Sequence, residues 1–332
     1  MTWLRRSVER QWYTRPDWLW CLLPLTWLFR FLSARRRKKQ SRSPYQSSLP
    51  VVVVGNITVG GTGKTPAIIA LAKALQSRGH QPVIVSRGYG AAERSARLLP
   101  IAASAADYGD EPVLISVATG CPVVVGADRV AAVEYIERHK LGDVILSDDG
   151  LQHYRLGRRW EIAVVDSQRR LGNGYCLPVG PLREPPERLR EVDAVLLNGK
   201  GFEAPWLSAD KTYTMTLRPV GWRHVRSGEL FGLDGLELDG ATAIAGIGNP
   251  ARFFHTLQQL GFHGPTLSFA DHHAFTPADF SVINASVVLM TEKDAIKVRP
   301  FAADGWWALV VEAEIPDAVH NGLLQLLETP HS

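Results

Sequence analysis

The stretch Val51-Val-Val-Val-Gly-Asn-Ile-Thr-Val-Gly-Gly-Thr-Gly-Lys-Thr65 decides the fold that this sequence predicts. Four β-branched residues indicate a short buried strand, the glycines indicate a turn, and helix-forming residues follow over 66–78. Strand, glycine-rich loop and helix in this order are typical of a P-loop, which surrounds nucleotide phosphates with backbone N–H groups and a helix N-terminus. The expected nucleotide-binding residues are Thr58, Val59, Gly60, Gly61, Thr62, Gly63, Lys64 and Thr65.

Two side chains at the end of this loop have expected roles. The Lys64 amine should reach the outer phosphates, and the Thr65 hydroxyl should bind Mg²⁺. The strict P-loop pattern has glycine five places before Gly63, where this chain has Thr58. Gly60 and Gly61 are expected to supply the flexibility instead. We therefore predict a nucleoside triphosphate site.

A second apolar run, 144–146, leads through Ser147 into Asp148 and Asp149. A carboxylate at the carboxyl end of a strand is where P-loop proteins hold Mg²⁺. Two adjacent carboxylates repel each other unless a cation lies between or beside them. We predict a metal site here and leave open which of the two contacts the ion directly.

Three further segments carry possible chemistry. Asp110 precedes a predicted helix, where helix capping alone would explain it. In Asp271-His272-His273, one histidine oriented by a carboxylate is a better interpretation than a metal pair, because adjacent side chains point apart. The loop 180–185 offers Arg183 and Glu184 to a phosphorylated or hydroxyl-rich ligand. No guanine-reading Asn-Lys-x-Asp motif occurs, which favours ATP over GTP.

The rest of the body alternates short apolar strands with helices, which predicts a parallel sheet covered by helices on both faces. Segments 211–218 and 224–230 resemble the two strands of a hairpin, and a second α/β unit ending in a helix near 323–327 follows. We expect a membrane-associated helix over 1–35, a basic and polar linker over 36–49, a P-loop ATP-binding domain over 50–210, a hairpin linker over 211–235 and a smaller α/β domain over 236–332.

The N-terminal segment differs from the body in charge. Residues 1–42 hold eleven Lys and Arg against two acidic residues, a net +9, so the other 290 residues sum to −5. An acidic body makes nucleic-acid binding an unlikely function. The apolar run 18–29 contains three tryptophans and is too short for a membrane span. With the basic run 35–39 it is typical of a helix lying in the membrane interface; the alternative is a helix packed on the protein's own core. The three cysteines are scattered, which fits a reducing cytosol.

Taken in order, these motifs resemble the tetraacyldisaccharide 4′-kinase family, the lipid A kinases of Gram-negative bacteria, over nearly the whole chain. The P-loop form 55–65 matches the family's own, and Leu151, where Phe is expected, is a mild departure. The other matching segments are Ser86-Arg-Gly-Tyr-Gly90, Gly109-Asp-Glu-Pro112, Asp148-Asp-Gly-Leu-Gln-His153, Gly180-Pro-Leu-Arg-Glu-Pro185, Gly246-Ile-Gly-Asn-Pro250, Asp271-His-His273 and Thr291-Glu-Lys-Asp-Ala295.

The resemblance implies transfer of the ATP γ-phosphoryl to the 4′-hydroxyl of an acylated glucosamine disaccharide 1-phosphate, with Mg²⁺, at the cytoplasmic face of the inner membrane. It implies that Asp110 accepts the hydroxyl proton with His272, rather than His273, as its partner. Lys64 completes the implied catalytic set, and Arg183 with Glu184 would contact substrate. We infer no obligate protein partner. The rival hypothesis is a P-loop switch ATPase that docks on membranes without phosphorylating a small molecule.

Overall fold

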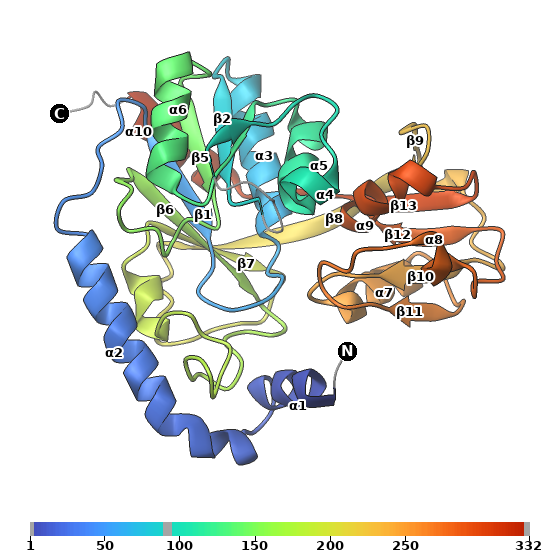
Figure 1. Ribbon diagram of the computed structural model, residues 1–332, viewed down its shortest axis with the longest axis horizontal. Helices are drawn as coiled ribbons and strands as arrows, with labels where there is room; N and C mark the ends of the chain where they lie inside the picture. The colour runs from blue at the N-terminus through green and yellow to red at the C-terminus, as the bar shows by residue number, and fades with distance from the viewer. Residues whose placement is uncertain (1–2, 89–94, 329–332) are drawn as a thin grey trace.

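The computed structural model describes residues 3–88 and 95–328 and shows two α/β units of unequal size, joined edge to edge by one long strand (Figure 1). The larger unit contains the P-loop and the smaller one most of the chain after residue 224. The predicted α/β fold is confirmed.

The strands of the described residues form one sheet in the order β11-β10-β12-β13-β8-β7-β6-β1-β5-β2-β4-β3, with β9 paired to β8. Pairing is parallel except at β13–β8, β8–β9 and β3–β4. The strands are β1 Val51–Gly55, β2 Pro82–Ser86, β3 Arg97–Leu98, β4 Val123–Val125, β5 Val144–Asp148, β6 Trp160–Asp166, β7 Ala194–Asn198, β8 Thr212–His224, β9 Leu230–Phe231, β10 Thr242–Ala245, β11 Thr266–Ser268, β12 Val288–Thr291 and β13 Trp306–Glu314.

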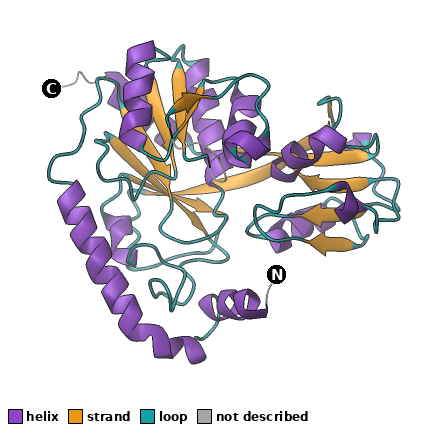
Figure 2. Ribbon diagram, viewed as in Figure 1, coloured by secondary structure: helices purple, strands orange, loops and turns teal. Residues whose placement is uncertain are grey.

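Helices cover both faces of the larger unit's strands, as predicted (Figure 2). The α-helices are α1 Trp3–Trp12, α2 Leu23–Gln40, α3 Lys64–Ser77, α4 Ala105–Tyr108, α5 Asp110–Thr119, α6 Arg129–His139, α7 Pro250–Gln259, α8 Pro277–Phe280, α9 Glu292–Val298 and α10 Asp317–Glu328. Shorter 3-10 turns are η1 Trp18–Leu22, η2 Pro186–Arg190, η3 Leu233–Gly235 and η4 Arg299–Phe301.

The run of valines in β1 shows why this segment lies at the centre of the sheet. Its five residues are all buried. Val52 and Val54 pack into the cluster that includes α3, whereas Val51 and Val53 pack into the cluster that includes α6. A strand buried on both faces reads as a continuous apolar run because successive side chains point to opposite faces.

The predicted hairpin of 211–218 with 224–230 is wrong, because Thr212–His224 is one continuous strand. Its first part pairs with β7 in parallel and its later part with β13 antiparallel. Only the two residues of β9 fold back on it, at Trp222 and Arg223. Pro219 and Gly221 lie where the register of β8 with β13 shifts, so they mark a β-bulge.

The last helix also differs from the expectation. Residues 323–327 were expected to end the smaller unit, but α10 crosses back to the larger one. Val319 and Leu323 lie in the same buried cluster as α3 and β1. The smaller unit is covered by α7 on one face and by α8 and α9 on the other.

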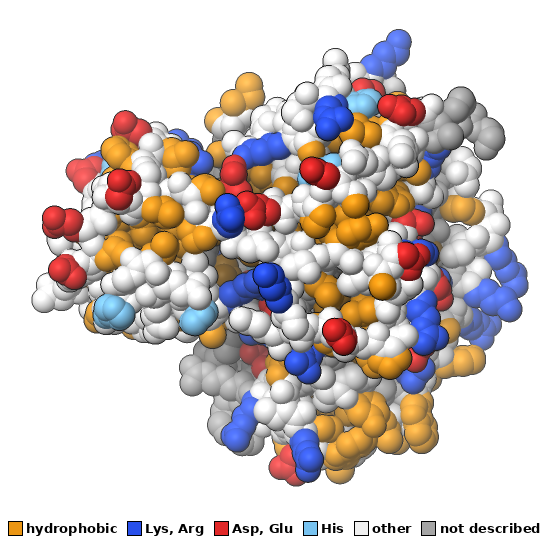
Figure 3. Space-filling view, turned by 180° about the vertical axis from the view of Figure 1, so that it is seen from behind, with side chains coloured by type: hydrophobic (Ala, Val, Ile, Leu, Met, Phe, Trp, Pro, Cys, Tyr) orange, Lys and Arg blue, Asp and Glu red, His pale blue; other side chains and the backbone are white. Residues whose placement is uncertain are grey.

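Helix α2 extends to Gln40, so the basic run 35–39 belongs to α2 and not to a linker. Lys and Arg are good helix formers and are favourable in the last turn of a helix. Leu19 and Thr26 are buried against the body, and the Thr26 hydroxyl donates to the Cys176 carbonyl at 3.3 Å. Hydrophobic side chains gather at the lower edge of the molecule in Figure 3, with Lys and Arg beside them. Among the described residues no helix combines the length and hydropathy of a membrane span.

Candidate active site

A cavity of about 690 Å³ lies where the carboxyl ends of strands from both units meet. The larger unit contributes the P-loop and the residues that follow β2, β5, β6 and β7. The smaller unit contributes the loop after β10, one side of α7, the Asp271–His272 pair and the start of α9. Ligands of open α/β sheets bind at the carboxyl ends of strands, so this cavity is the candidate active site.

The P-loop is shaped by two glycines in left-handed backbone conformations. Gly60 has φ 106° and Gly63 has φ 97°, values that side chains with a Cβ rarely adopt. A Cβ on Gly63 would lie 2.4 Å from the Asn198 side-chain nitrogen. That nitrogen donates to the Thr62 carbonyl at 2.9 Å, so the end of β7 fixes the loop. Lys64 then begins α3.

The loop 180–185 runs beside the P-loop. The Val59 amide donates to the Pro181 carbonyl at 2.8 Å, and the Arg183 amide donates to the Ile57 carbonyl at 2.7 Å. The Arg183 guanidinium thereby reaches both carboxylate oxygens of Asp149, at 2.8 and 3.1 Å. Burial alone raises the pKa of Asp149, but the charges of Lys64 (3.7 Å) and Arg183 outweigh it and lower the pKa below its usual range.

The neighbouring Asp148 differs from Asp149 in its hydrogen bonding and in the direction of its pKa shift. It is 2 % exposed, and its Oδ2 accepts a hydrogen bond from the Ser86 hydroxyl at 2.9 Å. Its Oδ1 is buried without a hydrogen-bond partner. Burial, with the negative charges of Glu111 and Asp149, raises the pKa of Asp148 to about 7. A buried carboxylate with an unused oxygen calls for a cation.

Oxygen donors suited to Mg²⁺ are therefore present. Asp148 and Thr65 both line the cavity, whereas Asp149 is already engaged by two basic side chains. No group of three or more His, Cys, Asp or Glu side chains within residues 3–88 and 95–328 is arranged to hold a metal. Mg²⁺ in nucleotide sites commonly takes one or two protein ligands, with phosphate and water supplying the rest. The residues present fit such an ion.

The predicted partners Asp110 and His272 meet across the two units. Asp110 begins α5 and is 5 % exposed, and His272 Nδ1 lies 3.0 Å from its Oδ2 and 3.2 Å from its Oδ1. The contact with Asp110 raises the pKa of His272. Burial raises the pKa of Asp110, but His272 and Lys293 more than offset it and lower the pKa.

His273 lies elsewhere. Its Nε2 is 3.3 Å from Asp279, and its ring stacks on Phe269 with 4.9 Å between ring centroids. The two histidines diverge because His272 has φ 58°, a left-handed conformation that turns the chain between them. Of the two, only His272 contacts Asp110.

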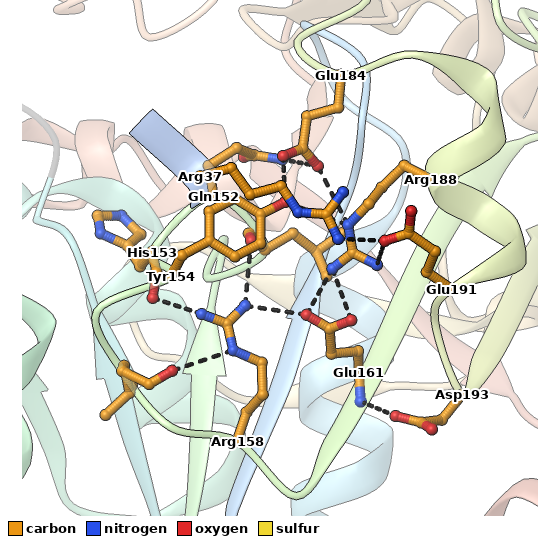
Figure 4. Close-up of polar contacts among 12 residues, drawn as sticks. Arg37, Gln152, His153, Tyr154, Arg158, Glu161, Glu184, Arg188, Glu191 and Asp193 are labelled. Atoms are coloured by element: carbon orange, nitrogen blue, oxygen red, sulfur yellow. Dashed lines mark hydrogen bonds and ion pairs between the residues drawn. The ribbon is translucent and has the colours of Figure 1, made fainter. Parts of the chain in front are cut away.

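Glu184 is not brought together with the other predicted residues. It is 7 % exposed and does not line the cavity. Its carboxylate accepts a hydrogen bond from the Tyr154 hydroxyl and lies 3.5 Å from the Arg188 guanidinium, in the polar network of Figure 4. Glu184 therefore supports the loop that carries Arg183, and a direct contact with substrate would need that network to open. Thr58 is likewise buried beside the cavity and outside its lining.

Sequence reasoning missed two residues that line the cavity, Lys293 and Arg252. One is Lys293, which contacts Asp110, Glu111 and Asp271. Its segment, Thr291-Glu-Lys-Asp-Ala295, was identified from the sequence only as part of the resemblance, with no role assigned to the lysine. The other is Arg252, whose guanidinium donates to Asn198 at 2.6 Å and to Asp166 at 3.3 Å. No local sequence signal identifies Arg252, because its partners lie at the ends of β6 and β7.

The chain was compared with known proteins. The model of the tetraacyldisaccharide-1-P 4′-kinase family matches residues 18–328. A tetraacyldisaccharide 4′-kinase from Alcanivorax borkumensis is 45% identical to this chain over 324 residues, and the alignment covers 97% of each chain. One from Shewanella denitrificans is 44% identical over 333 residues, with 98% of each chain covered.

The chain belongs to the tetraacyldisaccharide-1-P 4′-kinase family. A crystal structure of LpxK from Aquifex aeolicus, an "apo" form in complex with ATP, superposes with a TM-score of 0.81 at 26% identity, covering 94% of this chain and 100% of that one. The resemblance predicted from the ordered motifs is thus confirmed. Of those motifs, Tyr89 and Gly90 lie outside the described residues of this kinase.

Proposed function

We propose that the chain transfers the γ-phosphoryl group of ATP to the 4′-hydroxyl of a tetraacylated glucosamine disaccharide 1-phosphate, giving lipid IV A, a late step of lipid A biosynthesis. One observation carries the proposal: a single cavity holds a P-loop lysine on one side and a carboxylate–histidine pair on the other. Family membership supplies the identity of the acceptor.

On the phosphate side, the P-loop amides and Lys64 bind the β- and γ-phosphates. Arg183 and Lys64 hold Asp149 ionised beside them. Thr65 with Asp148 or Asp149 would hold Mg²⁺, and Asp148 is the better candidate because one of its oxygens has no hydrogen bond. The ion would neutralise charge on the phosphates. Phosphoryl transfer depends mainly on such alignment and neutralisation.

On the acceptor side, Asp110 takes the proton. The 4′-oxygen forms a bond to the γ-phosphorus while the bond from that phosphorus to the bridging oxygen breaks, and ADP leaves. The proton of the hydroxyl passes to the Asp110 carboxylate, whose lowered pKa keeps it ionised and ready to accept. His272 fixes the orientation of that carboxylate through its 3.0 Å contact.

We further propose that α2 and η1 place this site at the cytoplasmic face of the inner membrane, as a peripheral or monotopic attachment. Leu19 and Thr26 face the body, while Trp27 and Phe31 are 63 % and 61 % exposed. Aromatic side chains exposed beside the basic run 35–39 suit the interface of an anionic membrane. We expect replacement of Trp27 and Phe31 by serine to reduce co-sedimentation with anionic vesicles. Equal sedimentation of variant and parent would contradict this attachment.

The decisive test of the transfer is direct. Purified protein is incubated with γ-labelled ATP, Mg²⁺ and the disaccharide 1-phosphate, and the lipid is analysed for label and for the position of the new phosphate. Label in the lipid supports the kinase. Label released only as inorganic phosphate, at a rate that the lipid does not change, would instead support the switch ATPase.

A further inference from the structure

Lys293 occupies the centre of a group of acidic side chains at the acceptor side of the cavity. Its Nζ lies 2.9 Å from Glu111 Oε1, 3.9 Å from Asp110 Oδ2 and 3.9 Å from Asp271 Oδ1. Asp110 and Glu111 begin α5 of the larger unit, whereas Lys293 and Asp271 belong to the smaller one. The lysine therefore carries a positive charge from one unit to the carboxylates of the other.

The backbone around Lys293 holds it firmly in this place. Strand β12 turns directly into α9, and the Thr291 hydroxyl at the turn accepts a hydrogen bond from the Asp294 amide at 3.2 Å. Asp294 is fully buried and accepts a hydrogen bond from the Gly246 amide at 3.0 Å. The start of α9 is thus tied to the end of β10, so the lysine projects from a fixed base toward the cavity that it lines.

The charges facing Asp110 determine what Lys293 does there. His272 and Lys293 contact Asp110 directly, and Lys297 acts on it from farther away. The negative charges of Asp110 and Glu111 repel each other, and Asp271 contacts both His272 and Lys293. Burial also disfavours the ionised carboxylate. Lys293 also pairs with Glu111 and with Asp271, so its charge offsets the negative charge of the carboxylates that surround Asp110. His272 Nε2 lies 3.9 Å from Asp271 as well.

We propose that Lys293 is a positioning residue for the transfer step: across the contact between the two units, it holds the Asp110 carboxylate ionised and in place. This inference rests on the proposed kinase activity. It assigns no contact with substrate to Lys293. An ion pair that served stability alone would leave the dependence of turnover on pH unchanged, and this difference makes the inference testable.

The experiment compares Lys293→Gln, Lys293→Arg and the parent in the labelled-ATP transfer assay, from about pH 3 to pH 9, a range that includes the lowered pKa of Asp110. Lys73→Gln is the matched control, because Lys73 on α3 also pairs across the units, with Glu312 on β13 at 2.9 Å, but outside the cavity. We expect Lys293→Gln to lower kcat by about 10- to 100-fold, the range for partial loss of a general base, while KM for ATP changes by less than about threefold.

The pH profile is the decisive measurement. Removing the lysine charge raises the pKa of Asp110, so the acidic limb of kcat should move to higher pH by about one unit, the scale of one nearby opposite charge. Lys293→Arg, which keeps the charge, should retain the parental limb, and Lys73→Gln should match the parent throughout. In an Asp110→Asn background, adding Lys293→Gln should lower kcat little further.

Two outcomes would overturn the inference. One is a Lys293→Gln enzyme with parental kcat. The other is a lowered kcat with an unmoved acidic limb and a matching loss of thermal stability, which would show a structural ion pair. Failure of the parent enzyme to label the lipid would instead refute the proposed function, so the two failures are distinguishable.

Discussion

The two sides of the cavity are built in different ways. On the phosphate side, Lys64, Asp149 and Arg183 all belong to the larger unit and contact one another within it. On the acceptor side, Asp110 belongs to the larger unit, but His272 and Lys293 come from the smaller one. The phosphate side is therefore complete within one unit, whereas the acceptor side exists only when both units meet.

This difference separates nucleotide binding from transfer. Within the larger unit, the P-loop is held by Asn198 and by the loop 180–185. Asp110, the proposed proton acceptor, has its partners His272 and Lys293 in the smaller unit, so the acceptor side depends on both units.

The largest expected effect comes from the phosphate side. Lys64→Ala should lower kcat by at least about 100- to 1000-fold, since it removes the charge that faces the outer phosphates, a loss of the size found for other preorganised charge-stabilising groups. Steady-state transfer at saturating ATP measures it. Lys73→Ala, an exposed lysine later in the same helix, is the control and should retain activity. Near-parental turnover by Lys64→Ala would end the P-loop assignment.

On the acceptor side, Asp110→Asn and His272→Gln should each lower kcat by about 10²- to 10⁴-fold, with smaller changes in KM for ATP. Because the two groups act as one unit, the double variant should be little worse than the worse single variant. Kinetics of the three variants measure this coupling. Losses that multiply would show independent roles and would break the distinction drawn between the two sides.

Gly248→Ala should disturb the contact between the smaller unit and the P-loop. A Cβ on Gly248 would lie 2.7 Å from the Gly61 backbone nitrogen, which cannot move without displacing the P-loop. We expect kcat to fall by about tenfold, by analogy with other small misplacements of catalytic groups. Gly322→Ala in α10, whose Cβ would meet the Trp160 ring at 3.4 Å, is the control. Unchanged kcat in Gly248→Ala would mean that the acceptor side tolerates a shifted smaller unit.

The smallest effect is on stability. Asp110 raises the pKa of His272 above its ordinary value of 6.5. The ion pair therefore stabilises the fold fully below pH 6.5 and loses this contribution as pH rises through the raised pKa. The Asp110 charge persists down to its own lowered pKa. His272→Gln should therefore cost stability at pH 6 but not at pH 9, by less than about 1 kcal/mol for a partly exposed pair. Denaturant melts at both pH values measure it; equal costs would contradict the linkage.

Local sequence patterns were sufficient to predict much of the secondary structure of this protein. The valines of β1 and the glycines before Lys64 predicted strand, loop and helix, because each local preference agrees with the buried sheet. The contact of Asp110 with His272 was expected only through the resemblance. Nothing in the spacing of residues 162 positions apart brings them together.

What failed was the interpretation of residues with two possible uses. Pro219 and Gly221 are turn residues by composition, yet β13 pairs with β8 through them and converts the expected turn into a bulge. Glu184 next to Arg183 looked like a second ligand-binding side chain. Arg183 lines the cavity, whereas Glu184 contacts Tyr154 and Arg188 in a buried polar network. The residues next to Glu184 in the sequence do not predict these contacts.

The continuous strand β8 has a consequence for how the molecule comes apart. Its backbone hydrogen-bonds to β7 of the larger unit and to β13 of the smaller one, so loss of either unit removes an edge from the other. Helix α10 adds a second link, because its apolar side chains lie in the core of the larger unit although it follows β13. We therefore expect the two units to unfold in a single cooperative transition, and the amide hydrogens of the middle of β8 to be among the slowest to exchange with solvent.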